Sequence, residues 1–113
     1  MKTNFTPLVS IVIPTYNHGN YIGKAIKSLI NQTYQNWEAI IIDNHSTDQT
    51  YEEIKNYSDS RIKYFEINNN GVIAKSRNYG ITISKGDWIA FLDSDDWWTK
   101  DKLEVCVNNI NDK

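Results

Sequence analysis

The sequence predicts an α/β fold in which an open, mostly parallel sheet of about four strands is flanked by helices. Apolar runs of strand length alternate with segments whose apolar residues recur at helical spacing. The first two runs are nearly continuous, which is typical of strands buried on both faces of a parallel sheet. Polar or acidic clusters directly follow three of the runs, and in such a sheet they meet at one rim, where ligands bind.

Two βα units are predicted in the first half of the chain. The first strand covers 8–13 and is expected to end at Pro14, before an amphipathic helix. The second strand covers 37–42. Ser46 and Gln49 then stand at capping-box spacing, which predicts the start of a second helix.

The second half repeats this alternation with weaker signals. Residues 61–67 alternate polar and apolar side chains, which predicts a strand nearer an edge of the sheet. A loop over 68–71 leads to a helix over 72–84, and 88–92 predicts a buried strand. The residues expected on one side of the 72–84 helix are Ile73, Ala74, Arg77, Gly80 and Ile81. A closing helix is marked by Leu103, Cys106, Val107 and Ile110.

Composition narrows the class of protein. Of the 113 residues, 40% are hydrophobic and 23% charged, and the formal net charge of -2 gives no reason to expect nucleic-acid binding. Residues 1–7 are expected to form a flexible leader, too short and polar for a signal peptide, before one domain over 8–113. No apolar run approaches the roughly 18 residues of a membrane span. The single cysteine, Cys106, is interpreted as a small core residue, and a cytoplasmic location is expected.

The densest chemistry follows the fourth predicted strand, where Asp93, Asp95 and Asp96 lie close together. Carboxylates at this density repel one another and are commonly neutralised by a divalent cation. We therefore expect Asp95, with Asp93, to hold a cation that bridges a diphosphate. Helix capping alone would suit a lone aspartate better than this cluster. His18 and His45 have no partner at metal-ligand spacing, so neither is assigned a chemical role.

Residues after the other strands predict a nucleotide pocket. Tyr16 can stack on a base, Asp43 and Asn44 can pair with a base or ribose, and Arg77 adds positive charge. Turn and cap chemistry for Asp43 and Asn44, and packing for Tyr16, stay open as simpler interpretations.

Four segments, taken in order, resemble the motif series of the family 2 glycosyltransferases with the GT-A fold. They read VSIVIPTYN at 9–17, IDNHSTD at 42–48, AKSRNYG at 74–80 and FLDSDD at 91–96. Each string alone is weak, but four in the right order and spacing are specific, and they cover almost the whole chain from Leu8. The resemblance implies a Rossmann-like, nucleotide-binding half of a GT-A domain.

For the nucleotide, the resemblance implies roles residue by residue. Pro14 and Tyr16 would line the base pocket, with Tyr16 against the ring. Asp43 and Asn44 would contact base or ribose, and Arg77 would lie near the nucleotide. The family often has two adjacent aspartates where this chain has Asp43 and Asn44, so an amide that both donates and accepts replaces an acceptor. A UDP-sugar is favoured as the donor, and a dTDP- or GDP-sugar stays open.

For the reaction, the resemblance implies metal-dependent, inverting transfer of a sugar to a glycan or lipid-linked acceptor. Asp93 and Ser94 would approach the ribose or diphosphate, while Asp95, with Asp93, would hold Mn²⁺ or Mg²⁺. The catalytic carboxylate of inverting members comes well after this motif. The base is therefore expected beyond residue 113, since Glu104 and Asp112 are poorly placed for general-base work.

The chain is accordingly expected to be the donor-binding half of a longer enzyme, inactive alone, that acts in the cytoplasm or peripherally at the membrane. An uncovered sheet edge predicts self-association. Two other classes fit parts of the pattern. A receiver-type signalling domain is disfavoured because no acidic residue follows the first strand, where residues 14–17 read PTYN. A non-catalytic nucleotide-binding or scaffolding module stays open as an alternative. The sequence contains neither the P-loop motif nor the dinucleotide-binding motif, so modules of those two kinds are disfavoured.

Overall fold

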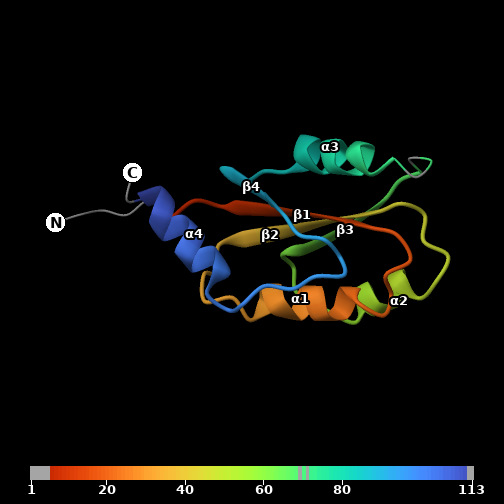
Figure 1. Ribbon diagram of the computed structural model, residues 1–113, viewed down its shortest axis with the longest axis horizontal. Helices are drawn as coiled ribbons and strands as arrows, with labels where there is room; N and C mark the ends of the chain where they lie inside the picture. Colours follow the sequence, from red (N-terminus) through yellow and green to blue (C-terminus); the bar gives the residue numbers. More distant parts are fainter. Residues whose placement is uncertain (1–5, 69, 71, 112–113) are drawn as a thin grey trace.

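The computed structural model describes residues 6–68, 70 and 72–111. Its elements, in order, are β1 (Val9–Thr15), α1 (Ile22–Ile30), β2 (Trp37–Asp43), α2 (Thr50–Lys55), β3 (Ile62–Glu66), α3 (Ile73–Ile83), β4 (Trp88–Phe91) and α4 (Lys102–Asn111). The four strands form one parallel sheet in the order β3-β2-β1-β4. Figure 1 shows α3 on one face of this sheet and α1 and α2 on the other. The predicted fold class is confirmed.

The two central strands, β1 and β2, are buried along their whole length and pair in register from Val9 with Trp37 to Thr15 with Asp43. The expectation that Pro14 ends the first strand was wrong, because Pro14 lies inside β1. The carbonyl of Thr15 accepts a hydrogen bond from Asn44 on the β2 side. Backbone groups alternate along a strand, so Pro14 faces the β4 side, where the pairing has already ended at Val12. Its missing N–H therefore leaves no ladder bond unmade.

The two faces of the sheet have cores of different size. Under α1 and α2, a large cluster includes Ile11, Ile13 and Leu29, whereas the cluster under α3 is built on Val12, Ile40 and Ile42. The larger cluster contains the apolar stripe of α1, whose buried residues are Ile22, Ala25, Ile26 and Leu29. This stripe confirms the amphipathic helix that the sequence predicts there.

Helix α3 packs by small residues, not by the apolar side expected for it. Its buried residues are Ser76 and Gly80, while Ile73 and Ile81 are 55% and 40% exposed. A Cβ added at Gly80 would lie 2.5 Å from Val12 Cγ1, so the missing side chain lets the helix backbone approach the sheet. The prediction that five residues of this helix share its inner side was therefore wrong for Ile73, Ala74 and Ile81, which are exposed. It holds for Gly80, which is buried, and in part for Arg77, which is half-buried.

The start of α2 also differs from the expected capping box. The residue before its first turn is Gln49, which makes no side-chain cap hydrogen bond. Asp48 instead accepts hydrogen bonds from the N–H of Thr50, at 3.0 Å, and from its hydroxyl. Ser46 lies four residues before the first residue of α2, and its hydroxyl accepts from the Asn17 N–H and donates to Asp43.

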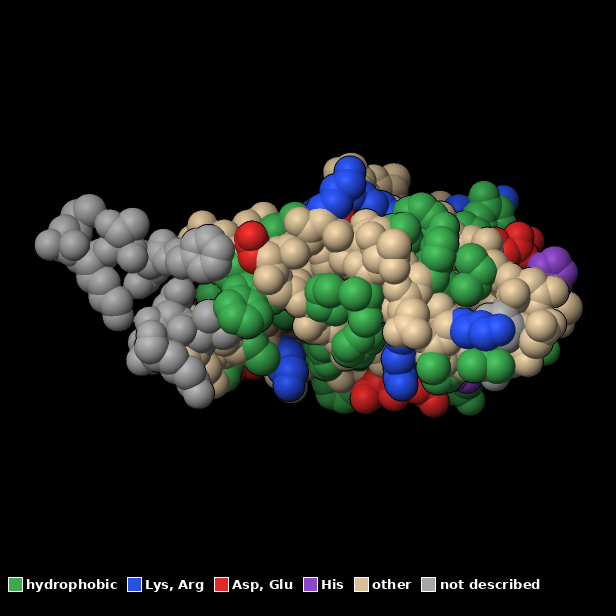
Figure 2. All heavy atoms as spheres, turned by 90° about the horizontal axis from the view of Figure 1, so that it is seen from above, with side chains coloured by type: hydrophobic (Ala, Val, Ile, Leu, Met, Phe, Trp, Pro, Cys, Tyr) green, Lys and Arg blue, Asp and Glu red, His purple; other side chains and the backbone are tan. Residues whose placement is uncertain are grey.

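The two edge strands are β3 and β4. The half-buried β3 confirms the expected edge position. The expectation that the fourth strand is buried was wrong: Trp88, Ile89 and Phe91 are between 40% and 45% exposed. Among the described residues, only β1 pairs with β4, so no strand lies along the outer side of β4. Figure 2 looks onto the face that carries α3 and shows exposed hydrophobic side chains in patches between polar ones.

Helix α4 lies at the end of the sheet where β1 begins (Figure 1). It turns Leu103 and Val107 inward, as their spacing predicts. Cys106 is exposed, so its interpretation as a core residue was wrong, because one helical position before Val107 lies off the buried stripe. The side chain of Ile110 falls outside the described part of the structure.

The ends of the chain and one loop are only partly described. Of the expected leader, residues 1–5 lie outside the described residues, while Pro7 is buried and its carbonyl accepts a hydrogen bond from the Tyr34 hydroxyl. Residues 69 and 71 of the expected loop, and Asp112, also lie outside the described residues. Among the described helices, none has the length and apolar character needed to cross a membrane.

Candidate functional site

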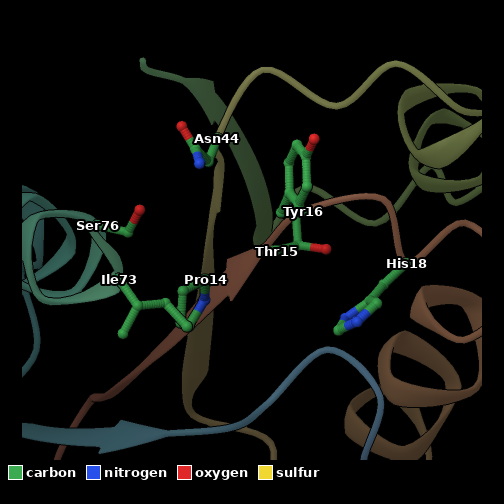
Figure 3. Close-up of a pocket in the computed structure, with 7 residues that line it drawn as sticks. All are labelled: Pro14, Thr15, Tyr16, His18, Asn44, Ile73 and Ser76. Carbon is green, nitrogen blue, oxygen red and sulfur yellow. The ribbon is translucent and has the colours of Figure 1, made fainter. Parts of the chain in front are cut away.

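A pocket of about 270 Å³ opens at the carboxyl ends of β1 and β2. Figure 3 shows the residues that line it, which are Pro14, Thr15, Tyr16, His18, Asn44, Ile73 and Ser76. They come from the end of β1 and the loop after it, from the residue that follows β2, and from the first turn of α3. The pocket therefore lies at the rim where the fold class places a ligand.

The loop after β1 is held in place by Asn17. This residue has a φ of 50°, in the left-handed region that asparagine adopts more readily than most residues. Its N–H donates to Ser46 Oγ at 2.9 Å, and its Oδ1 accepts from the Thr47 N–H at 2.8 Å. These contacts tie the loop after β1 to the loop after β2. Tyr16, one residue earlier, is left 53% exposed at the pocket.

Asp43 lies next to this pocket but turns its carboxylate away from it. Oδ1 accepts hydrogen bonds from the N–H of Ser46, at 3.0 Å, and from its hydroxyl, while Oδ2 accepts one from the Tyr64 hydroxyl at 2.6 Å. Only 1% of the residue is exposed, and it lines a separate hollow with Tyr64. Both carboxylate oxygens are thus engaged within the protein, on the side away from Tyr16.

Burial raises the pKa of Tyr64, and the hydrogen bond to Asp43 and its negative charge raise that pKa further. The phenol is therefore protonated at neutral pH and available as a donor. A carboxylate that accepts bonds from Tyr64 and Ser46 is a structural anchor for the residues that follow β2.

Asn44 is the member of this pair that lines the pocket. Its N–H donates to the Thr15 carbonyl at 2.9 Å, which continues the pairing of β1 with β2 by one residue. Figure 3 shows Asn44 and Tyr16 on the same side of the pocket. Successive side chains alternate in direction along a strand, so Asp43 and Asn44 face different ways.

The acidic segment after β4 reaches the pocket through Ser94. This serine is 1% exposed, and its Oγ lies 2.5 Å from Nδ1 of His18, one of the pocket residues. On either side of it, Asp93 and Asp95 are exposed. The segment turns back where the Asp96 N–H donates to the Asp93 carbonyl at 2.9 Å. Two exposed carboxylates therefore flank the serine that is bonded to the pocket.

Arg77 links α3 to the same segment. Its Nη2 lies 3.7 Å from Asp93 Oδ1, and its guanidinium lies 5.9 Å from the centre of the Phe91 ring. Its Nε is buried and has no hydrogen-bond partner among the described residues. Arg77 directly follows the pocket residue Ser76 in α3, and its positive charge lies next to Asp93.

The donor atoms of the acidic segment suit a shared cation and not an all-protein cage. Within the described residues, no group of three or more His, Cys, Asp or Glu side chains is arranged to hold a metal. Carboxylate oxygens are ligands for hard divalent cations, which commonly take one or two of them together with phosphate oxygens and water. Asp95 and Asp93, both exposed, fit that smaller contribution.

The structure therefore brings together most of the residues that the sequence points to. Pro14, Tyr16 and Asn44 line one pocket, and Arg77 and Asp93 meet beside it. Sequence reasoning missed the pocket residues Thr15, His18, Ile73 and Ser76. Thr15 could have been found from its place between two predicted pocket residues. The contact of His18 with Ser94 spans 76 positions and carries no local sequence signal.

Comparison with known proteins covers nearly the whole chain. The family model described as "Glycosyl transferase family 2" matches residues 10–113. An uncharacterized glycosyltransferase of Haemophilus influenzae is 46% identical over 104 residues, which are 90% of this chain and 42% of that protein. An Escherichia coli protein, the UDP-Glc:alpha-D-GlcNAc-diphosphoundecaprenol beta-1,3-glucosyltransferase WfgD, is 42% identical over 92% of this chain and 43% of its own length.

Among solved structures, S. aureus TarS 1-349 in complex with UDP matches with a TM-score of 0.87 and 30% identity. The match covers 92% of this chain and 32% of that one. The same S. aureus protein has been solved in complex with UDP-GlcNAc, where the TM-score is 0.86. The chain thus spans about two fifths of the length of these curated relatives.

Proposed function

The chain belongs to glycosyl transferase family 2 and has the GT-A type of fold, and from this premise we propose that it forms the donor-binding part of a glycosyltransferase. In the proposed reaction a sugar passes from a nucleotide-diphosphate sugar to a glycan or lipid-linked acceptor. The observation that carries the proposal is the pocket lined by Tyr16 and Asn44, which the bond between His18 and Ser94 joins to two exposed carboxylates.

We assign the base of the nucleotide to the side of the pocket formed by Pro14, Tyr16 and Asn44. Tyr16 offers an exposed ring for stacking, and Asn44 offers an amide that can donate and accept along the edge of a base. Asp43 acts on the base indirectly, by holding Ser46 in the loop after β2. A UDP-sugar is the favoured donor, which the UDP and UDP-GlcNAc complexes of the similar S. aureus protein support. The dTDP- and GDP-sugars are the alternatives.

We assign the diphosphate to the side of the pocket next to Arg77 and the acidic segment. Asp95, with Asp93, would hold Mn²⁺ or Mg²⁺, and Arg77 keeps Asp93 close to α3. When bound, the cation neutralises charge on the diphosphate and so favours its departure. The proposed transfer inverts the configuration at the sugar, as the family resemblance implies. We assign its general base to no residue within the described part of the chain.

Calorimetry on this chain tests the proposal. UDP, dTDP and GDP are titrated with and without Mn²⁺, and we expect UDP to bind most tightly and Mn²⁺ to increase its affinity. Asp95→Asn should lower the Mn²⁺-dependent UDP affinity by about tenfold or more, since it removes the charge of a metal ligand. Asp101→Asn, which makes the same charge change just before α4, is the matched control. Absence of binding for all three nucleotides would contradict the proposal.

We also propose that the exposed edge of β4 lets the chain self-associate. Trp88, Ile89 and Phe91 are exposed there, and β4 has no strand on its outer side within the described residues. Light scattering over a concentration series should show an average mass above that of the monomer. Trp88→Lys should shift this distribution toward the monomer. A constant monomer mass at high concentration would contradict the proposal.

A further inference from the structure

The imidazole of His18 is a polar group of the pocket to which no family motif assigns a role. His18 is half-buried and lies in the loop between β1 and α1, two positions after Tyr16. Its Nδ1 lies 2.5 Å from the hydroxyl oxygen of the buried Ser94. The ring therefore joins the loop after β1 to the segment that carries Asp93 and Asp95.

Both the backbone and the ring of His18 are fixed by further contacts. Its carbonyl accepts hydrogen bonds from the N–H groups of Tyr21, at 2.9 Å, and Ile22, at 2.8 Å, where α1 begins. The ring packs edge-to-face against Tyr21, with the ring centres 5.7 Å apart. Figure 3 shows the imidazole directed from its loop toward the segment after β4, while Asn44 and Tyr16 lie on the other side of the pocket.

These contacts leave one ring nitrogen for a ligand. Ser94 engages Nδ1, and no hydrogen bond within the described residues engages Nε2. When the Ser94 hydroxyl donates to Nδ1, the ring proton is on Nε2, which is then a donor. In that tautomer, Nε2 is a hydrogen-bond donor on a ring held beside the acidic segment.

We propose that His18 donates a hydrogen bond from Nε2 to an oxygen of the donor's diphosphate, and that Ser94 positions the ring for it. The inference rests on the proposed function. The diphosphate is the part within reach because His18 is bonded to Ser94, whose neighbours Asp93 and Asp95 are the proposed cation ligands. The base of the nucleotide is assigned to the side of Tyr16 and Asn44, so it is not within reach of His18. A donor there supplements the single cation and Arg77 in binding a group that carries several negative charges.

A purely structural role for His18, that of a partner for the buried hydroxyl of Ser94, is the alternative to exclude. Two substitutions separate the two nitrogens. In His18→Asn the amide occupies the place of Nδ1, so the contact with Ser94 is kept and Nε2 is lost. In His18→Gln the longer side chain carries its amide to the region of Nε2. His45→Asn, at a residue whose Nδ1 lies 3.1 Å from Glu66, is the control histidine.

The measurement is the affinity of each variant for UDP and for uridine, by calorimetry in the presence of Mn²⁺. For His18→Asn we expect UDP affinity to fall about tenfold and uridine affinity to stay constant, since only the diphosphate loses a partner. His18→Gln should recover part of the UDP affinity, and His45→Asn should change neither. Thermal unfolding of each variant verifies that the fold is kept.

Unchanged UDP affinity in His18→Asn would overturn the proposal in favour of the structural role, because this variant keeps the contact with Ser94. Equal losses for UDP and uridine in His18→Asn would overturn it as well, because the lost partner would then not be one that only the diphosphate contacts. A different result, in which the unsubstituted chain binds no nucleoside diphosphate, would contradict the proposed function itself. The uridine titration of the unsubstituted chain distinguishes these cases, because it reports the base side of the pocket independently of His18.

Discussion

Asp43 ends one strand and Asp95 follows another strand of the same sheet, yet one carboxylate is buried and the other exposed. Asp43 is the last residue of the central strand β2, where β3 lies on one side and supplies the hydroxyl of Tyr64. Asp95 follows the edge strand β4, whose outer side carries no neighbouring strand among the described residues. The same side chain therefore serves as an anchor at the centre of the sheet and is exposed at its edge, where we propose that it binds a cation.

The largest effect expected from this comparison is on stability at Asp43. Asp43→Ala removes the acceptor of three hydrogen bonds and leaves the Tyr64 hydroxyl without its partner. We expect the free energy of unfolding to fall by about 3 kcal/mol, in the range of a broken buried network. Urea unfolding followed by circular dichroism measures it. A loss below about 1 kcal/mol would mean that Asp43 is not the anchor described.

A smaller effect is expected from the other side of the same bond. Tyr64→Phe deletes one donor to Asp43 and keeps the ring, whose centre lies 4.9 Å from that of Tyr51. The free energy of unfolding should fall by about 1–2 kcal/mol, because Ser46 still satisfies one oxygen of the carboxylate. Tyr51→Phe, measured by the same unfolding experiment, is the matched control. If the free energy of unfolding changed as little as in the control, the hydrogen bond from Tyr64 to Asp43 would not stabilise the fold.

The smallest effect on stability is expected at Asp95. Asp95→Asn alters an exposed side chain, so the free energy of unfolding should stay within about 0.5 kcal/mol of the unsubstituted chain. The same variant is expected to lose the Mn²⁺-dependent part of UDP binding. Substitution of Asp43 would then lower the free energy of unfolding, whereas substitution of Asp95 would lower the affinity for UDP. A marked loss of stability in Asp95→Asn would erase the distinction between the two sites.

Much of the fold could be predicted from the sequence because β1 and β2 are continuous apolar runs and α1 has a clear apolar stripe. The run over 88–92 looks the same, but three of its side chains, those of Trp88, Ile89 and Phe91, are at least 40% exposed. An apolar run shows that a strand packs against something, and it cannot tell a central strand from an edge strand. The same limit applies to α3, where the close approach at Gly80 replaces the usual apolar contacts.

The candidate site could be predicted only as far as strand ends define it. Strand-end positions identified Tyr16 and Asn44, since the carboxyl ends of parallel strands meet at one rim. The direction of the Asp43 side chain depends on Tyr64, a residue of another strand. The role inferred for His18 depends on Ser94, which is 76 positions away in the sequence. Such contacts arise from the tertiary packing and leave no local pattern.

The absence of a side chain at Gly80 affects more than the packing of α3. This helix also carries Ile73 and Ser76, which form one wall of the pocket. Any larger residue at position 80 would meet Val12 and push the helix outward, so the wall would move with it. In a mutational scan scored by nucleotide affinity, Gly80 should therefore rank among the sensitive positions, although it is not one of the residues lining the pocket. The width of the pocket is thus set on the same face of the helix as Ser76, one turn further along.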